Sequence, residues 1–308
     1  MKAPTADEIA TLLAKYGMHG DVRPLRDGYI NWVFAVGGAH VLRINKPHRG
    51  EEDSYTEAVA VPAAVAAGIR TPKLIAFDDS RSEIPYVYTI YERAEGVALA
   101  EVRADQRELP VLYRELGAEI ANCHTRITVV EDPNGWLDKP YFCDPRTELE
   151  TARSELKIEL VTYDWIAKWN ERLAPAIEAE GETVFVHNDL HAGNTMVTEG
   201  PLRLSALIDW GDACWGDPAL DMERVPIWAT PWLLEAYHGA TGSVDDVFVG
   251  RVLAHVLGTT LYKACDPEFD PTDQPWHPFP NAFAFNLVRL MRMELPPEWH
   301  DWLPDAPI

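Results

Sequence analysis

The sequence has no long apolar run, few cysteines and far fewer basic than acidic residues. No stretch reaches about 18 apolar residues without a charge, so no membrane-spanning helix is expected. The first residues lack the apolar core of a secretory signal. The cysteines have neither metal-ligand nor redox spacing: Cys123, Cys143, Cys214 and Cys265. Together these absences predict reduced thiols and a cytoplasmic location.

The shortage of basic residues gives a formal net charge of -22, from 27 Lys and Arg against 49 Asp and Glu. Nucleic acids and anionic membranes attract basic surfaces, so neither is expected as a partner. The charge has two open explanations, which are solubility and attraction of a cationic substrate. A hydrophobic content of 47% supports a sizeable core, and 308 residues fit one large domain or two modest ones.

The chemically most informative stretch begins with a β-type run that ends at Val186. The run leads into His187-Asn188-Asp189, Asn194 follows after four more residues, and a second apolar run ends just before Asp209. Phosphoryl transfer needs a carboxylate that takes the proton of the acceptor hydroxyl. It also needs an amide oxygen and a second carboxylate that hold Mg²⁺ beside the phosphates. This order and spacing predict Asp189 as the catalytic base and Asn194 and Asp209 as magnesium ligands.

Two other interpretations of this stretch stay open. His187, Asp189 and His191 could form a zinc site, although Gly193 favours a loop and no third soft ligand lies near in the sequence. A kinase fold can also be retained without catalysis, as a silent nucleotide-binding protein, because fold does not fix function. The complete set of catalytic residue types argues against that silent protein.

Three motifs follow one another over about 35 residues. They are the run from His187 to Asn194, then Ile208-Asp209-Trp210, then Gly216-Asp217-Pro218-Ala219 with Asp221. This arrangement resembles the aminoglycoside phosphotransferase and choline kinase family, with Asp209-Trp210 standing where protein kinases have Asp-Phe-Gly. The resemblance implies a kinase that uses ATP or GTP with Mg²⁺. It also implies that His187, Asp217 and Asp221 support the catalytic loop.

The resemblance further implies a bilobal α+β protein-kinase-like fold. Residues 1–93 would form an N-lobe with a five-stranded antiparallel sheet and a helix, and residues 94–308 a mainly helical C-lobe with the catalytic loop and the acceptor site. A capping box, Thr5-x-x-Glu8, separately predicts a first helix over residues 6–16. In the helical pattern around Glu57, Pro62 is expected to kink the helix or to start it afresh.

Several N-lobe residues are assigned to the nucleotide by the resemblance alone. The turn from Gly28 to Asn31 would approach the phosphates. Arg43 stands where the family has a phosphate-binding lysine, and an arginine can grip a phosphate bidentately. Lys46 is the alternative cation, and Glu57 would pair with whichever cation binds.

The remaining expectations concern the two substrates. Backbone groups from Tyr91 to Arg93 resemble the hinge of the family and would contact the purine. The acceptor is expected to be a hydroxyl of a cationic, aminoglycoside-type antibiotic, because the acid-rich segments 144–164 and 266–273 could line a pocket for a polyamine. Macrolides, cyclic peptides, choline and homoserine stay open as acceptors. Aromatic side chains would suit an apolar ring or a quaternary ammonium: Trp228, Trp232 and Trp276.

Overall fold

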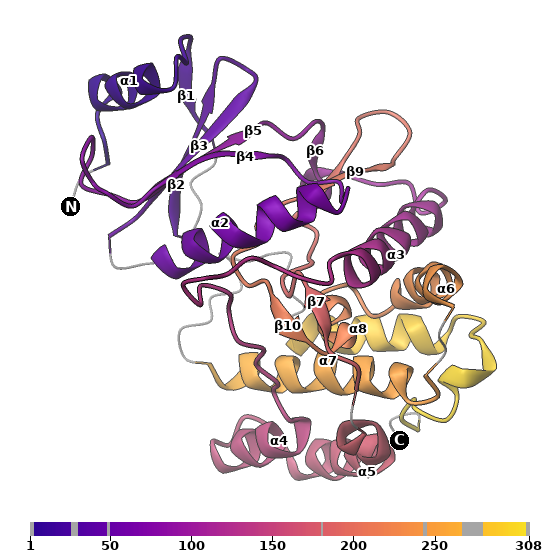
Figure 1. Ribbon diagram of the computed structural model, residues 1–308. Helices are drawn as coiled ribbons and strands as arrows, with labels where there is room; N and C mark the ends of the chain where they lie inside the picture. Colours follow the sequence, from indigo (N-terminus) through magenta and orange to yellow (C-terminus); the bar gives the residue numbers. More distant parts are fainter. Residues whose placement is uncertain are drawn as a thin grey trace.

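A computed structural model describes residues 3–25, 30–47, 50–179, 181–242, 245–266 and 280–305. A twisted sheet with two helices lies at one end of the molecule, and a larger, mainly helical part lies at the other (Figure 1). The predicted bilobal α+β fold is therefore confirmed. The boundary at residue 93 stays a prediction.

The N-terminal sheet is antiparallel and has five strands in the spatial order β1-β2-β3-β5-β4. Its strands are β1 (Val22–Pro24), β2 (Asn31–Val36), β3 (His40–Asn45), β4 (Leu74–Asp78) and β5 (Tyr88–Glu92). Helix α1 (Ala6–Lys15) begins at the predicted capping box, and its buried leucines pack against the sheet. The register places Arg43 on the central strand, opposite Val33 and Thr89.

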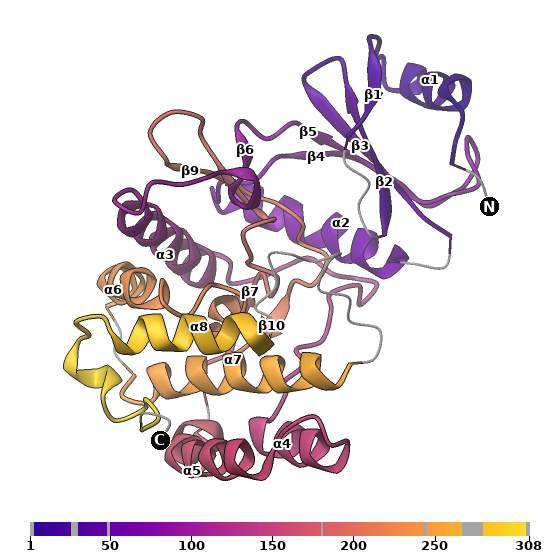
Figure 2. The same ribbon diagram turned by 180° about the vertical axis from the view of Figure 1, so that it is seen from behind.

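Helix α2 (Glu51–Ala66) crosses between the sheet and the C-terminal part (Figures 1 and 2). It continues through Pro62 instead of starting afresh there. Pro62 is exposed, so water can satisfy the backbone carbonyl that its missing N–H leaves without a partner. Asp53 and Glu57, which are four residues apart, lie on one face of this helix.

The C-terminal part is built around α7 (Phe248–Cys265), a helix that is buried over most of its length. Helices α4 (Pro145–Ser154) and α5 (Leu160–Glu178) pack against it at the end of the molecule far from the sheet (Figures 1 and 2). The other helices are α3 (Leu109–Arg126), α6 (Thr230–Thr241) and α8 (Pro280–Met291), with short 3-10 turns η1 (Leu99–Glu101), η2 (Pro218–Met222) and η3 (Pro297–Trp299). None of the helices in the described ranges combines the length and apolarity of a membrane crossing.

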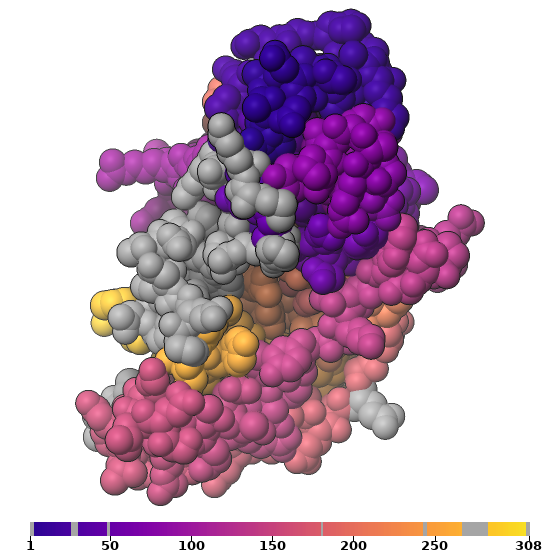
Figure 3. All heavy atoms as spheres, turned by 90° about the vertical axis from the view of Figure 1, so that its left-hand side faces the viewer, coloured from indigo at the N-terminus to yellow at the C-terminus, as the bar shows by residue number. Residues whose placement is uncertain are grey.

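Two small sheets carry the segment that contains the predicted catalytic residues. Strand β7 (Val184–Val186) pairs with β10 (Cys214–Gly216), and β8 (Thr195–Val197) lies between β6 (Val97–Ala98) and β9 (Leu204–Leu207). In the space-filling view, orange atoms lie deep in a hollow between purple atoms of the N-terminal part and pink atoms below (Figure 3). The strands thus bring the segment to the junction of the two parts.

Candidate active site

His187 ties the catalytic loop to the segment that ends at Asp209. Its side chain is fully buried, its Nε2 lies 3.0 Å from the carbonyl oxygen of Ile208, and its Nδ1 accepts a bond from the N–H of Asp189. Burial lowers the pKa of His187, so the ring is neutral and its proton resides on Nε2. These bonds tie the loop to the neighbouring segment, and the supporting role of His187 in catalysis stays a prediction.

Asp221 holds the backbone of the same loop. Its Oδ2 accepts from the N–H of His187 (3.2 Å) and its Oδ1 from the N–H of Asn188 (2.7 Å). Asn188 has a φ of 64°, an unfavourable value for a residue with a side chain, and the Asp221 bonds hold it there. Asp217 was also expected to brace the loop. Its carboxylate instead accepts from the N–H of Ala219, which caps η2, and pairs with Arg251.

The carboxylate of Asp189 is held through both oxygens. Its Oδ2 accepts from Nδ2 of Asn194 at 2.7 Å, and its Oδ1 is ion-paired with Nη1 of Arg224. Burial raises the pKa of Asp189, but the Arg224 guanidinium and His191 outweigh it and hold that pKa well below its usual range. Asp189 is therefore ionised and oriented before any substrate binds.

Asn194 and Asp209 can hold a magnesium ion. The Nδ2 of Asn194 donates to Asp189, which leaves its Oδ1 for a metal. The N–H of Ile208 bonds the carbonyl oxygen of Asn194 at 3.0 Å, so the two candidate ligands lie on adjoining segments. An amide oxygen and a half-exposed carboxylate fit Mg²⁺, which prefers oxygen and uses few protein ligands beside phosphates.

Arg43 stands at the centre of an ion-pair chain across the junction. Its Nη1 lies 2.6 Å from Oε1 of Glu57, and its Nη2 lies 2.8 Å from Oδ1 of Asp209. Tyr91 donates its hydroxyl proton to Oε2 of Glu57 at 2.7 Å. Burial raises the pKa of Glu57 to about 7, while Arg43 acts to lower it. The arginine thus makes the contact to Glu57 that was expected of the strand cation.

The other N-lobe residues expected to bind the nucleotide differ in their surroundings. Asn31 is buried between Asn45 and the Arg43 guanidinium, so it contacts protein groups. Lys46 follows β3, and its N–H bonds the carbonyl oxygen of Ile30. Arg93 is exposed, and its N–H donates to the carbonyl oxygen of Ala39, so that donor is already used. Gly28 lies outside the described residues.

The structure adds three charged residues that the sequence reasoning missed: Asp53, Asp212 and Arg224. Burial and the neighbouring carboxylates raise the pKa of Asp53 to about 6 and that of Asp212 to about 8. A Cβ at Gly211 would lie 2.5 Å from Cβ of Asp53, so α2 approaches the segment after Asp209 as closely as a glycine allows. The four-residue spacing of Asp53 and Glu57 was a usable signal, whereas no short motif marks Arg224.

Of the two acid-rich segments expected at the acceptor site, the described one, 144–164, does not lie at Asp189. Residues 144–164 belong to α4, α5 and their connection, at the end of the molecule far from the sheet (Figures 1 and 2). Most of the segment 266–273, and Trp276, lie outside the described residues. Trp228 and Trp232 pack against one another with ring centroids 6.0 Å apart, and Trp228 is buried in the core.

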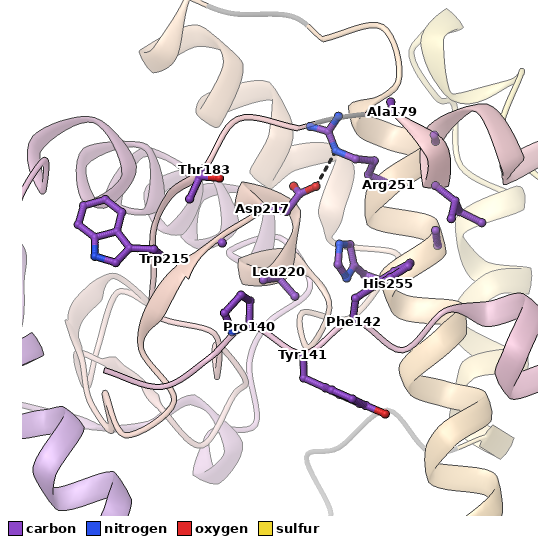
Figure 4. A pocket seen from close by; sticks show the side chains of 14 residues that line it. Pro140, Tyr141, Phe142, Ala179, Thr183, Trp215, Asp217, Leu220, Arg251 and His255 are labelled. Atoms are coloured by element: carbon purple, nitrogen blue, oxygen red, sulfur yellow. Dashed lines mark ion pairs between the residues drawn. The ribbon is translucent and has the colours of Figure 1, made fainter. Parts of the chain in front are cut away.

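A cavity of about 350 Å³ lies at the end of β7 and β10 that is remote from His187. Trp215, Phe142 and His255 line it, with the Asp217 carboxylate 2.9 Å from Nε of Arg251 (Figure 4). None of the candidate catalytic or metal-binding residues lines this cavity. The candidate catalytic and metal-binding residues therefore lie at the junction of the two parts and not in the cavity.

Comparison with known proteins concerns the family and the fold. The chain is 25% identical over 243 residues to the hygromycin-B 4-O-kinase of Escherichia coli. The aligned region covers 72% of this chain and 66% of that enzyme. It has the fold of a choline/ethanolamine kinase family protein from Mesorhizobium loti, with a TM-score of 0.61 and 18% identity. The match covers 96% of this chain and 97% of that one.

The fold also matches the ternary complex of APH(2")-IIa with streptomycin and ATP, with a TM-score of 0.58, 13% identity and coverage of 98% of this chain and 100% of that one. At these identities the solved structures establish the fold alone. The family model of the phosphotransferase enzymes named APH matches residues 21–244. The chain belongs to the APH family of phosphotransferase enzymes, as the three linked motifs predicted.

Proposed function

We propose that this protein transfers the γ-phosphate of ATP or GTP to a hydroxyl of a cationic, aminoglycoside-type antibiotic and so confers resistance. The observation that carries the proposal is the meeting of Asp189, Asn194 and Asp209 beside the Arg43–Glu57 pair. This set supplies a base, metal ligands and a phosphate-binding cation at one place.

In the proposed reaction Asp189 orients the acceptor hydroxyl and takes its proton. The hydroxyl oxygen forms a bond to the γ-phosphorus as the bond between that phosphorus and the β-phosphate oxygen breaks, and a nucleoside diphosphate leaves. Mg²⁺, held by Asn194 and Asp209, would neutralise the charge on the phosphates. The low pKa of Asp189 agrees with a base whose main task is orientation, because the transition state is loose.

The proposed contact between Arg43 and the nucleotide requires a change of partner. In the structure Arg43 bonds Asp209 through Nη2 while Glu57 holds Nη1. A metal bound by Asp209 would compete for that carboxylate, and the freed half of the guanidinium would then meet a phosphate. Glu57, with Tyr91 behind it, keeps the arginine in place during the exchange.

The cationic character of the acceptor is supported by the carboxylates around Asp189. Asp53, Asp209 and Asp212 repel one another, and this repulsion contributes to the raised pKa of Asp53 and Asp212. A bound ammonium group would relieve the repulsion, as would Mg²⁺. The relatives named above that act on or bind antibiotics are a hygromycin-B kinase and the streptomycin complex.

Release of nucleoside diphosphate tests the proposal. ATP and GTP are each supplied with Mg²⁺ and one acceptor from a panel of hygromycin B, streptomycin, gentamicin, a macrolide, a cyclic peptide, choline and homoserine. We expect acceptor-dependent turnover with an aminoglycoside and an acceptor KM that rises with ionic strength, because salt screens the carboxylates. Asp189→Asn is the matched control for background hydrolysis. Tight nucleotide binding without turnover on any acceptor would favour the silent protein, and turnover only with a macrolide would remove the cationic acceptor.

A further inference from the structure

Arg224 makes the most direct contact with the candidate base of any cation in the described part of the chain. It follows η2, and its guanidinium is ion-paired with Oδ1 of Asp189. The same guanidinium lies 3.9 Å from the carboxylate of Asp212, and its Nε lies 3.4 Å from Oε1 of Glu223. Its side chain is 24% exposed, so it lies at the wall of the site and not in the core.

Arg224 is held by Glu223, which is in turn bonded to α7. Glu223 is buried, and its Oε2 accepts from the hydroxyl of Thr259, on α7, at 3.2 Å. Glu223 thus joins α7, which is buried over most of its length, to the guanidinium. Arg224 can therefore transfer the position of α7 to the carboxylate of Asp189.

We propose that Arg224 is a positioning residue for phosphoryl transfer, which fixes the Asp189 carboxylate in the orientation that meets the acceptor hydroxyl. The inference rests on the proposed function. Arg224 holds Oδ1 and Asn194 holds Oδ2, so rotation of the carboxylate would break one bond or the other. Each carboxylate oxygen has two lone pairs. Nε2 of His191 also lies 3.6 Å from Oδ2, so the second lone pair of Oδ1 is the one left for the acceptor.

The alternative is an ion pair that only stabilises the fold. Such a pair exists elsewhere in the chain and makes a matched control: Nε of Arg70 lies 3.0 Å from Oε2 of Glu119, which is buried. Arg70 also bonds the carbonyl oxygen of Leu204, so its planar group has two partners, and its side chain is 42% exposed against 24% for Arg224. It lines a cavity beside Arg93 of the expected hinge, and none of its ion pairs or hydrogen bonds in the described part of the chain goes to Asp189, Asn194 or Asp209. Loss of either arginine leaves a buried carboxylate without its cation.

The experiment compares Arg224→Ala, Arg224→Lys and Arg70→Ala with the unchanged enzyme. A misplaced reacting group costs on the order of a hundredfold in rate, so we expect Arg224→Ala to lower kcat about ten- to a hundredfold. The KM of the nucleotide should stay within about twofold, since Arg224 contacts the carboxylate of Asp189 and is not expected to contact the nucleotide. Arg224→Lys should recover part of kcat, and added guanidinium at a sub-denaturing concentration should raise kcat of Arg224→Ala. Arg70→Ala should lower the thermal midpoint, keep kcat and show no response to guanidinium.

The outcomes separate this inference from the function on which it rests. If kcat of Arg224→Ala stays within about twofold of the unchanged enzyme, Arg224 does not position Asp189. A loss of kcat that neither lysine nor guanidinium restores, with a fall in thermal midpoint like that of Arg70→Ala, also overturns the inference, because a structural pair behaves in that way. If the unchanged enzyme phosphorylates no acceptor, the proposed function fails first.

Discussion

Asp221 and Asp212 lie on the same stretch of chain, yet their surroundings differ. Asp221 is buried and accepts bonds from two backbone N–H groups, and its Oδ2 lies 2.9 Å from Nε2 of His124, whose other ring nitrogen contacts Tyr237. Asp212 is 39% exposed, and the arginine that lies 3.9 Å from it is already paired with Asp189. One carboxylate is satisfied by the fold, and the other is not.

The difference indicates what each region is for. A buried carboxylate with all its bonds made fixes one conformation, and Asp221 holds the catalytic loop in this way. Carboxylates that repel one another cost stability in the empty protein, and the cost is recovered when cations bind. The region around Asp221 therefore serves the fold, and we propose that the cluster of Asp53, Asp209 and Asp212 serves binding. The predictions below test this division.

The largest effect is expected from Asp189→Asn. The substitution keeps the shape of the side chain and removes the carboxylate that takes the proton, so kcat should fall about 10²–10⁴-fold. Nucleotide affinity should change only a few-fold, because Asp189 meets the acceptor. Measurement of kcat and of nucleotide Kd for the same preparation decides it, and turnover at the unchanged rate would place the base elsewhere.

Asp221→Ala should act on stability instead. It leaves the N–H groups of His187 and Asn188 and the ring of His124 without their acceptor, and each buried orphan costs about 1–3 kcal/mol. We expect a loss of about 3–5 kcal/mol in the free energy of unfolding, measured by denaturant titration. Asp105→Ala is the control, because its partner Arg107 is exposed and surface pairs contribute little. An equal effect of the two substitutions would contradict the division between the regions.

The sequence was sufficient where function depends on local spacing. His187, Asp189, Asn194 and Asp209 follow from one loop and one hairpin, so their order along the chain already places them together. The contact of Arg224 with Asp189 depends on how η2 turns and on how Glu223 reaches α7, which no local pattern encodes. For the same reason composition could not show which surface α4 and α5 would occupy.

Two details show how tertiary structure changed a sound local expectation. Pro62 can remain inside α2 because that position faces solvent, and exposure is not visible in the sequence. For Tyr91 only the backbone was expected to act, at the hinge, and the structure adds a hydrogen bond from its hydroxyl to Glu57. Glu57 forms the expected ion pair with the strand cation, which is Arg43, and its link to the nucleotide stays a prediction.

Arg43→Ala should raise the nucleotide KM about ten- to a hundredfold, which corresponds to a charge-assisted contact of about 1.5–3 kcal/mol. Lys46→Ala should change it little, because Arg43 and not Lys46 forms the ion pairs with Glu57 and Asp209. Initial rates over a range of ATP or GTP concentrations compare the two substitutions. The reverse ranking would make Lys46 the phosphate-binding cation and would move the nucleotide toward the end of β3.

The smallest effect is expected from Asp212→Asn. This substitution tests how much the repulsion among the clustered carboxylates lowers the free energy of unfolding when no nucleotide or Mg²⁺ is bound. Burial and the charge of Asp189 raise the pKa of Asp212 to about 8, far above that of an unfolded aspartate. The folded state thus binds the Asp212 proton more tightly than the unfolded state does. Protonation of Asp212 therefore contributes its full stabilisation of the fold below about pH 4, and this contribution is lost as the pH rises through about 8.

Asparagine has no such proton to lose, so Asp212→Asn should gain stability relative to the unchanged protein as the pH rises from 5 to 8. The side chain is 39% exposed and solvent screens its charge, so we expect a gain of about 0.5–1 kcal/mol at pH 8 and less at pH 5. Thermal unfolding without nucleotide or Mg²⁺ at the two pH values measures it. Mg²⁺ with nucleotide should shrink the gain, because bound cations offset the same repulsion. A loss of stability at pH 8 would mean that Arg224 satisfies Asp212 as fully as the loop satisfies Asp221, and the two regions would then not differ in kind.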